Sequence, residues 1–220
     1  MHQYIKPIAE LFEEYADKEN ALGAKAYMRN QFEFFGLKAA VRRMIIKEYL
    51  KNDLPPENQL QTIIKELWQL PQREYQYFGI TLIASYKKKW TTNFIPLLDF
   101  MISHKSWWDS VDGIASEISG PFFTKHPELI KKTTKHWNAS ENYWMQRSSL
   151  LFQLKYKNKT DVLLLGKYIV KLSTSKEFFI QKAIGWVLRE YSKTNPDWVI
   201  DFVDQNSLSA LSKREALKYT

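Results

Sequence analysis

Two indole rings and two carboxylates lie within the stretch Lys105–Asp112, which reads Lys-Ser-Trp-Trp-Asp-Ser-Val-Asp. If this stretch is helical, Trp108 and Asp112 share one face, whereas Trp107 and Val111 belong to the stripe that faces the core. An aromatic plane and a carboxylate would then face outward side by side, and such a plane can stack on a nucleotide or a sugar. The alternative is a core tryptophan beside a solvated or capping aspartate, and this stretch alone favours that alternative.

Another tryptophan lies among cations in the stretch Lys176–Ser192. At helical spacing, Lys182, Trp186 and Arg189 fall on the face opposite the apolar one. Exposed aromatic residues among basic residues are typical of a nucleic-acid surface. The alternative is a tryptophan covered by a neighbouring loop, with its ring packed under the lysine and arginine stems.

A third stretch, Ser140–Leu154, places Arg147 on the same side as Tyr143, Leu150 and Leu154. A buried unpaired charge costs several kcal/mol, so this arginine needs an anionic partner, which is either a carboxylate on an adjacent helix or a phosphate. Trp108, Arg147 and Trp186 are each about one repeat apart, so a repeat array would bring them onto one wall, with Asp112 between them.

Helices are expected to hold these residues, because apolar side chains recur at intervals of three and four and clear strand alternation is missing. The expected helices cover residues 4–17, 25–35 and 38–51, followed by pairs at 57–70 with 72–87, 91–103 with 106–119, 127–136 with 140–154, 160–173 with 176–192, and 196–205 with 208–219. The second helices recur about every 35 residues, which is typical of helical-repeat solenoids. The sequence therefore predicts an all-α solenoid whose second helices line one concave surface.

Composition narrows the classes of function. The chain has 220 residues without an internal linker, and we expect one domain over residues 1–220. It has no cysteine, and its four histidines lack the spacing of metal ligands, so we expect no metal. No signal peptide or membrane-spanning run is recognisable, so a cytoplasmic protein is expected. The net charge of +8 suits a polyanionic partner.

Several long motifs, in the same order along the chain, resemble the AlkD family of DNA alkylation-repair glycosylases. The motifs are Lys105–Asp112, Trp144-Met-Gln-Arg147, Phe178–Ser192, Leu211–Leu217, Tyr27–Phe34 and Leu67–Phe78. The resemblance implies a solenoid of HEAT-like antiparallel helix pairs with a concave basic surface. It also implies removal of positively charged N3- and N7-alkylated purines, such as 3-methyladenine, 7-methylguanine and bulkier adducts, from duplex DNA in base excision repair.

By this resemblance Asp112 corresponds to the catalytic aspartate, and Trp108 and Trp186 to the aromatic pair that contacts the lesion's deoxyribose and backbone. Arg147 corresponds to a phosphate-contacting arginine, and Tyr27 and Arg189 to positions near the DNA. We expect further phosphate contacts from Lys105 and Lys182.

The expected reaction needs few groups. Alkylation at N3 or N7 already makes the base cationic, so it leaves as a neutral molecule and needs no general acid, in contrast to ordinary glycoside hydrolysis. One carboxylate is then sufficient to stabilise the oxocarbenium-like sugar and to position water. The resemblance implies a monofunctional enzyme. We expect it to need no cofactor and to act as a monomer in the cytoplasm, associated with the nucleoid when bound to DNA.

Two other readings stay open at this point. The chain can be a non-catalytic helical-repeat module that binds DNA, in which Asp112 is only the structural ion-pair partner of Arg147. It can also be a peptide-binding repeat scaffold, although that reading gives the alignment of Trp108, Arg147 and Trp186 no purpose.

Overall fold

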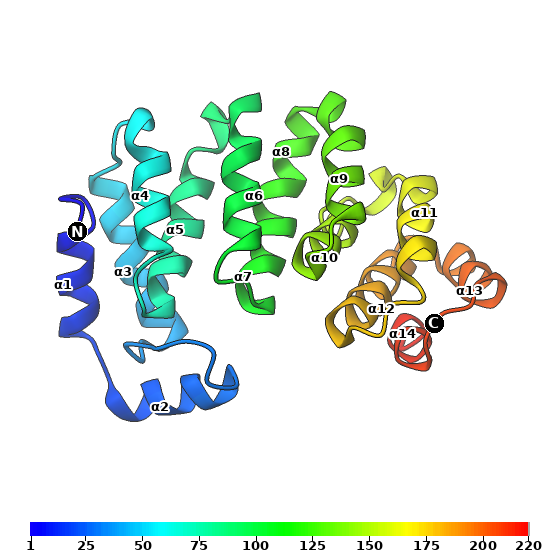
Figure 1. The fold of residues 1–220 in the computed structure, drawn as a ribbon, viewed down its shortest axis with the longest axis horizontal. Helices are drawn as coiled ribbons and strands as arrows, with labels where there is room; N and C mark the ends of the chain where they lie inside the picture. The colour runs from blue at the N-terminus through cyan, green and yellow to red at the C-terminus, as the bar shows by residue number, and fades with distance from the viewer. Residues whose placement is uncertain (220) are drawn as a thin grey trace. The chain divides into compact units, whose positions relative to one another are not determined.

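The computed structural model describes residues 1–219, and these residues are predominantly helical (Figure 1). Within this range there is no strand, and the one β-bridge joins Glu33 to Gln72. The prediction of an all-α helical-repeat fold is therefore confirmed. The chain divides into two units, Met1–Lys89 and Trp90–Thr220, which are described separately below. That residues 1–220 form one domain stays a prediction.

The first unit contains five α-helices and two short 3₁₀ helices. They are α1 (Lys6–Glu14), α2 (Lys18–Tyr27), α3 (Ala39–Asn52), η1 (Glu57–Gln59), α4 (Leu60–Leu67), α5 (Arg73–Ser85) and η2 (Lys87–Lys89). Helix α3 packs against α1 and α5, and α4 packs against α5. The helix pair expected at residues 57–87 is therefore present as α4 and α5.

The helix expected over residues 25–35 is wrong. Helix α2 instead spans Lys18–Tyr27, with the side chain of its N-cap residue Asp17 accepting a hydrogen bond from the Asn20 amide. The chain leaves the helix because Arg29 and Asn30 adopt positive φ angles of 54° and 58°, which an α-helix does not accommodate. The spacing of apolar residues does not reveal where two successive residues adopt positive φ angles.

The second unit contains the three stretches singled out in the sequence. Its helices are η3 (Thr92–Phe94), α6 (Ile95–Ser103), α7 (Trp108–Gly113), η4 (Ile114–Ser119), α8 (Gly120–Lys125), η5 (Pro127–Leu129), α9 (Ile130–Ala139), α10 (Tyr143–Leu151), η6 (Lys157–Lys159), α11 (Val162–Leu172), α12 (Phe178–Ser192), α13 (Pro196–Gln205) and α14 (Ala210–Ala216). Most expected boundaries are correct to within a few residues, and Pro196 occupies the first turn of α13 as expected.

One helical path in this unit changes its winding. Residues Ile114–Ser119 form a π-helix between α7 and α8, so the path that carries Asp112 continues as far as Lys125. The wider turns precede Pro121, which lacks the N–H that an α-helix needs at that point. At Gly120, an added Cβ would lie 2.5 Å from the Phe152 carbonyl oxygen, so only glycine permits this close approach. The expected helix end at residue 119 was therefore too early.

Helix α10 lies at the centre of the second unit. It packs against α6, α7, α9, α11, α12 and the π-helix. Its buried residues Leu150 and Leu151 join a core that includes Leu165, Ile184 and Val187 from α11 and α12. A side chain on α10 can therefore contact both α7 and α12, and this central position decides where Arg147 reaches.

Candidate functional site

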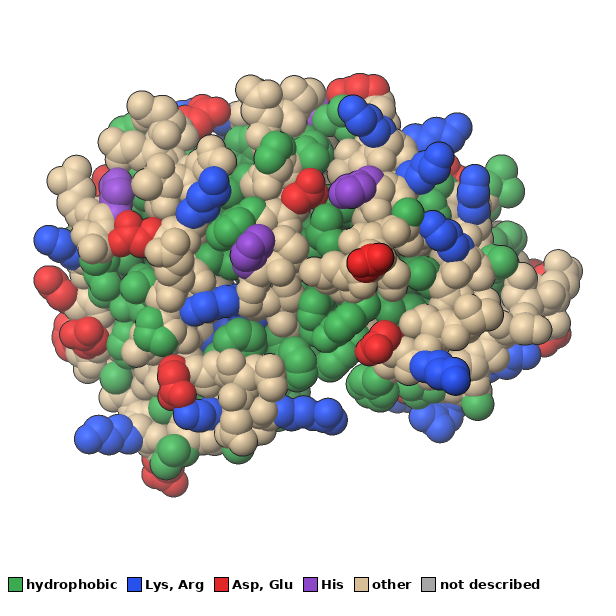
Figure 2. All heavy atoms as spheres, viewed as in Figure 1, with side chains coloured by type: hydrophobic (Ala, Val, Ile, Leu, Met, Phe, Trp, Pro, Cys, Tyr) green, Lys and Arg blue, Asp and Glu red, His purple; other side chains and the backbone are tan. Residues whose placement is uncertain are grey.

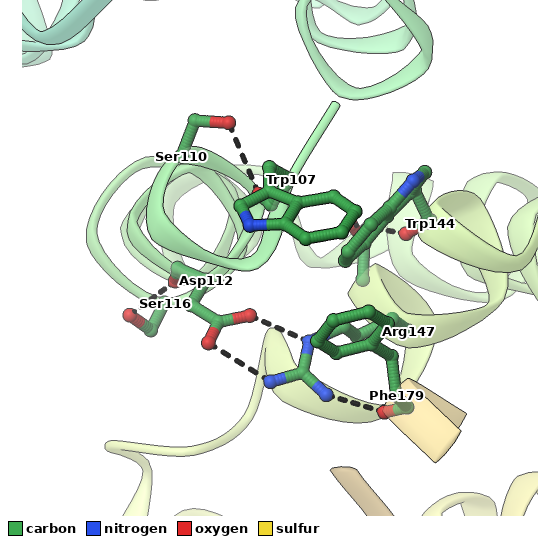
Figure 3. A network of polar contacts seen from close by, with 8 residues as sticks. Trp107, Ser110, Asp112, Ser116, Trp144, Arg147 and Phe179 are labelled. Atoms are coloured by element: carbon green, nitrogen blue, oxygen red, sulfur yellow. Dashed lines mark hydrogen bonds and ion pairs between the residues drawn. The ribbon is translucent and has the colours of Figure 1, made fainter. Parts of the chain in front are cut away.

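The guanidinium of Arg147, on α10, holds the carboxylate of Asp112, on α7, through two parallel hydrogen bonds (Figure 3). Arg147 Nε donates to Asp112 Oδ1 at 2.6 Å, and Nη2 donates to Oδ2 at 2.9 Å. A bidentate pair fixes the plane of the carboxylate as well as its position. The anionic partner predicted for this arginine is thus a carboxylate of an adjacent helix.

A third hydrogen bond completes the binding of Arg147. Its Nη1 donates to the backbone carbonyl oxygen of Phe179, in the first turn of α12 (Figure 3). The Arg147 side chain is 5% exposed and that of Asp112 is 16% exposed. In this conformation the contacts of the guanidinium are made inside the protein, while the carboxylate keeps an opening to solvent. Contact between Arg147 and a DNA phosphate stays a prediction.

Aromatic side chains pack beside this ion pair. The Phe179 ring lies 4.9 Å from Trp144 and 5.2 Å from Trp107, measured between ring centroids, and the two indoles are 5.7 Å apart. Tyr143 packs against Trp144 at 4.7 Å. We call Trp107, Tyr143, Trp144 and Phe179 the aromatic cluster. It collects side chains from the starts of α7, α10 and α12.

Burial changes the charge behaviour of Asp112. Burial raises the pKa of Asp112 above its ordinary value, while the hydrogen bonds and the charge of Arg147 act in the opposite direction. The nearby carboxylate of Asp109 adds a further raising effect. The result is an aspartate that is held tightly by a cation and still takes up a proton more readily than an exposed aspartate.

Trp107 differs from its expected place. It was assigned to the core stripe with Val111, which is fully buried, but Trp107 is the half-buried N-cap residue of α7 and belongs to the aromatic cluster. Its indole N–H is buried and has no hydrogen-bond partner. Ser106 does not cap α7, since its hydroxyl donates to the Ile102 carbonyl oxygen.

The two tryptophans predicted to contact the lesion are both half-buried. Trp108 is the first residue of α7, one turn before Asp112 on the same helix. Trp186, on α12, packs partly against the core of the second unit. Lys105, just before α7, is half-buried and adopts a positive φ of 46°. Their roles toward DNA stay predictions.

The predicted DNA-binding cations of α12 share one carboxylate. Glu215, on α14, accepts from Arg189 Nη1 at 2.6 Å and lies 3.1 Å from Lys182 Nζ. These contacts lower the pKa of Glu215, and the hydrogen bond from Lys182 is the largest cause. The α12 face that carries Trp186 is thus partly neutralised by an acidic residue that was not a predicted site residue.

Positive charge also occurs away from these helices. Figure 2 shows Lys and Arg side chains gathered over α9 and α11. The exposed lysines of these two helices are Lys131, Lys132, Lys135, Lys167 and Lys171. The basic character of the second unit is therefore not confined to α7, α10 and α12.

Tyr27, the remaining predicted DNA contact, lies in the first unit at the end of α2 and is 70% exposed.

Comparison with known proteins identifies the family. The family model described as "DNA alkylation repair enzyme" matches residues 8–220. The chain belongs to the DNA alkylation repair enzyme family. A solved structure from Enterococcus faecalis, titled a predicted DNA alkylation repair enzyme, is 37% identical, with a TM-score of 0.87, and the match covers 93% of this chain and 96% of that one. No curated protein matches.

Family membership gives this enzyme a role in the repair of alkylated DNA, with DNA as its partner. The described part of the chain brings together no three His, Asp or Glu side chains that could hold a metal ion. Among the described helices, none combines the length and the apolar character that crossing a membrane requires. In this family setting, the Asp112–Arg147 pair is the clearest candidate for the chemical centre.

Sequence reasoning missed three parts of this site. They are the Phe179 carbonyl, the indole of Trp144 and the carboxylate of Glu215. Every residue carries a backbone carbonyl, so nothing in the sequence distinguishes the one that binds Arg147. The closely spaced aromatic residues Tyr143-Trp144 and Phe178-Phe179, each at the start of an expected helix, were the available signal for the aromatic cluster.

Proposed function

We propose that the enzyme is a monofunctional DNA glycosylase that excises cationic N3- and N7-alkylated purines from duplex DNA. The observation that carries the proposal is the Asp112 carboxylate, which is fixed by both oxygens and yet 16% exposed, in a member of an alkylation-repair family. A fixed negative charge stabilises a developing cation without the energetic cost of reorienting water.

The proposed reaction begins with departure of the base. The glycosidic bond breaks, its electron pair leaves with the cationic purine, and the purine departs as a neutral molecule that needs no proton. The sugar then carries an oxocarbenium-like charge, which faces the Asp112 carboxylate. Because the site is partly shielded from water, this attraction is stronger than it would be at a fully exposed surface. Asp112 also positions the water that attacks the sugar, and that water loses its proton to solvent.

Other residues would hold the DNA. Trp108 and Trp186 would contact the deoxyribose and backbone at the lesion and stabilise the cationic sugar through their electron-rich faces. Tyr27, Lys105, Arg147, Lys182 and Arg189 would contact the DNA backbone. We further propose that the enzyme acts as a monomer in the cytoplasm, associated with the nucleoid.

The test is release of free 7-methylguanine from duplex DNA that carries this lesion. Wild-type protein should release the base, and Asp112→Asn should lose turnover by about a hundredfold or more, since it removes the charge that faces the sugar. Asp112→Asn should keep its DNA affinity. The matched control is Glu117→Gln, which removes an exposed carboxylate of the adjoining π-helix and should leave turnover unchanged.

A second candidate is a non-catalytic DNA-binding module. The bidentate Asp112–Arg147 pair favours it, because each charged side chain already has an oppositely charged partner within the protein. In that case wild-type protein binds lesion DNA but releases no base, and Asp112→Asn changes stability alone.

A further inference from the structure

The start of α12 is joined to the Asp112–Arg147 pair by a single backbone atom. The carbonyl oxygen of Phe179 accepts a hydrogen bond from Arg147 Nη1, on the side of the guanidinium that Asp112 does not use (Figure 3). A carbonyl oxygen has two lone pairs, so it can bind the arginine and still take part in its own helix. The guanidinium is thus held from both sides, by Asp112 and by Phe179.

The ring of Phe179 determines where its carbonyl lies. The ring packs between Trp144 on α10 and Trp107 at the start of α7, with centroid distances of 4.9 and 5.2 Å. Trp144 is itself buried. Packed aromatic rings leave little freedom to the backbone that carries them. The side chain of Phe179 therefore anchors the first turn of α12 against the other two helices of the site.

We infer that Phe179 is a positioning residue: its packed ring fixes its carbonyl, the carbonyl fixes the guanidinium of Arg147, and the guanidinium aims the carboxylate of Asp112. The kinetic consequences of this inference rest on the proposed glycosylase function, whereas its effect on the carboxylate does not. A residue that holds the partner of a reactive group can orient that group within the small tolerances that catalysis needs.

If Phe179 holds Arg147 less firmly, the pKa of Asp112 should change in a known direction. The charged groups that act on Asp112 are Arg147, which lowers its pKa, and Asp109, which raises it, while burial raises it further. If the guanidinium moves away, the lowering contribution decreases and the other two stay. The pKa of Asp112 therefore rises, and the ionised carboxylate is lost at a higher pH.

Neighbouring phenylalanines provide a matched pair of variants. Phe178 is 52% exposed and contacts Phe179 edge-on at 5.3 Å, but its carbonyl does not bind Arg147. Phe179→Ala should lower turnover of 7-methylguanine by about ten- to a hundredfold and move the acid limb of the pH–turnover profile to higher pH. Phe178→Ala should do neither. Phe179→Tyr, which keeps the ring, should restore most of the loss.

Carbon-13 NMR titration of the Asp112 carboxyl carbon in the free protein separates the inference from the proposed function. Its midpoint should rise in Phe179→Ala and stay at the wild-type value in Phe178→Ala. If Phe179→Ala does not fold, Phe179→Leu takes its place. Equal midpoints in wild type and the Phe179 variant would overturn the inference, whatever their activity. A wild type that releases no base would overturn the glycosylase proposal and leave this titration as a valid test.

Discussion

Two carboxylates of the second unit bind arginine side chains that differ in burial. Asp112 lies between α7 and α10, paired with Arg147, whose side chain is almost fully buried. Glu215 lies between α12 and α14, paired with Arg189 and with the more exposed Lys182. The pKa of Asp112 is raised and that of Glu215 is lowered. A bound cation therefore does not decide the protonation of a carboxylate by itself, because the loss of water around it can outweigh the cation.

This difference suits the two carboxylates to different proposed roles. A buried, rigidly held carboxylate suits a reaction in which charge develops close to it, since shielding from water strengthens the interaction. A carboxylate shared by two more exposed cations, Lys182 at 38% and Arg189 at 22% against 5% for Arg147, suits a surface that meets the phosphates of DNA. Its main effect there is to moderate positive charge. The comparison therefore supports the proposal that Asp112 faces the developing charge, while Lys182 and Arg189 on α12 are proposed contacts of the DNA backbone.

The largest expected effect is on stability, from replacing each arginine with methionine. Arg147→Met removes the partner of a buried carboxylate and should lower the free energy of unfolding by about 3–5 kcal/mol at neutral pH. Arg189→Met removes a more exposed contact and should cost about 1 kcal/mol or less. Urea denaturation of both variants gives the two values. Equal losses would mean that the Arg147 pair is no better shielded from water than the Arg189 pair, and the comparison would fail.

Alanine substitutions at two glycines beside the carboxylates should change the stability of the protein by intermediate amounts and in opposite directions. At Gly185, on α12, an added Cβ would lie 2.4 Å from Glu215 Cβ and 2.9 Å from the Ser212 carbonyl oxygen, whereas a Cβ at Gly113 meets nothing within 4 Å. Gly185→Ala should therefore destabilise the protein by about 1–3 kcal/mol. Gly113→Ala should stabilise it by about 0.5–1 kcal/mol through helix propensity.

Thermal denaturation measures both variants on one scale. A loss of stability in Gly113→Ala would mean that the path from α7 into the π-helix needs glycine for its own conformation. Tolerance of Gly185→Ala would mean that α14 can move away from α12, so that Glu215 does not hold Lys182 and Arg189 closely.

The sequence predicted the helices of the second unit better than the contacts between them. Apolar spacing gave the helix pairs because each helix buries one stripe of side chains. The same spacing missed the π-helix at Ile114–Ser119, since six residues of wider winding barely change an average period. It also ran a helix through Arg29 and Asn30, whose positive φ angles are a local backbone property.

The candidate site was predictable in part for a similar reason. A lone arginine on an apolar face must have an anionic partner, and Asp112, one repeat earlier, was the acid placed on the same predicted wall as Arg147. Whether a carboxylate or a phosphate met Arg147 could not be deduced, because both satisfy a guanidinium equally well. Glu215 was not foreseen, since its contact with α12 depends on how closely α14 packs at Gly185.

The smallest expected effect is the pH dependence of stability, and it has opposite signs at the two carboxylates. The folded-state pKa of Glu215 is lowered, so its contribution is present above the unfolded value of 4.5 and is lost as the pH falls through the folded value. The folded-state pKa of Asp112 is raised above 3.8, so protonation stabilises the folded state as the pH falls through its folded value. Urea denaturation measures this as the pH is lowered from neutral to 3. Over that range, wild type should lose stability relative to Glu215→Gln and gain stability relative to Asp112→Asn. Each change should be about 1 kcal/mol or less. Two differences of the same sign would mean that burial does not dominate at Asp112, and the carboxylate would then be an ordinary surface ion pair without a sheltered field to offer a sugar cation.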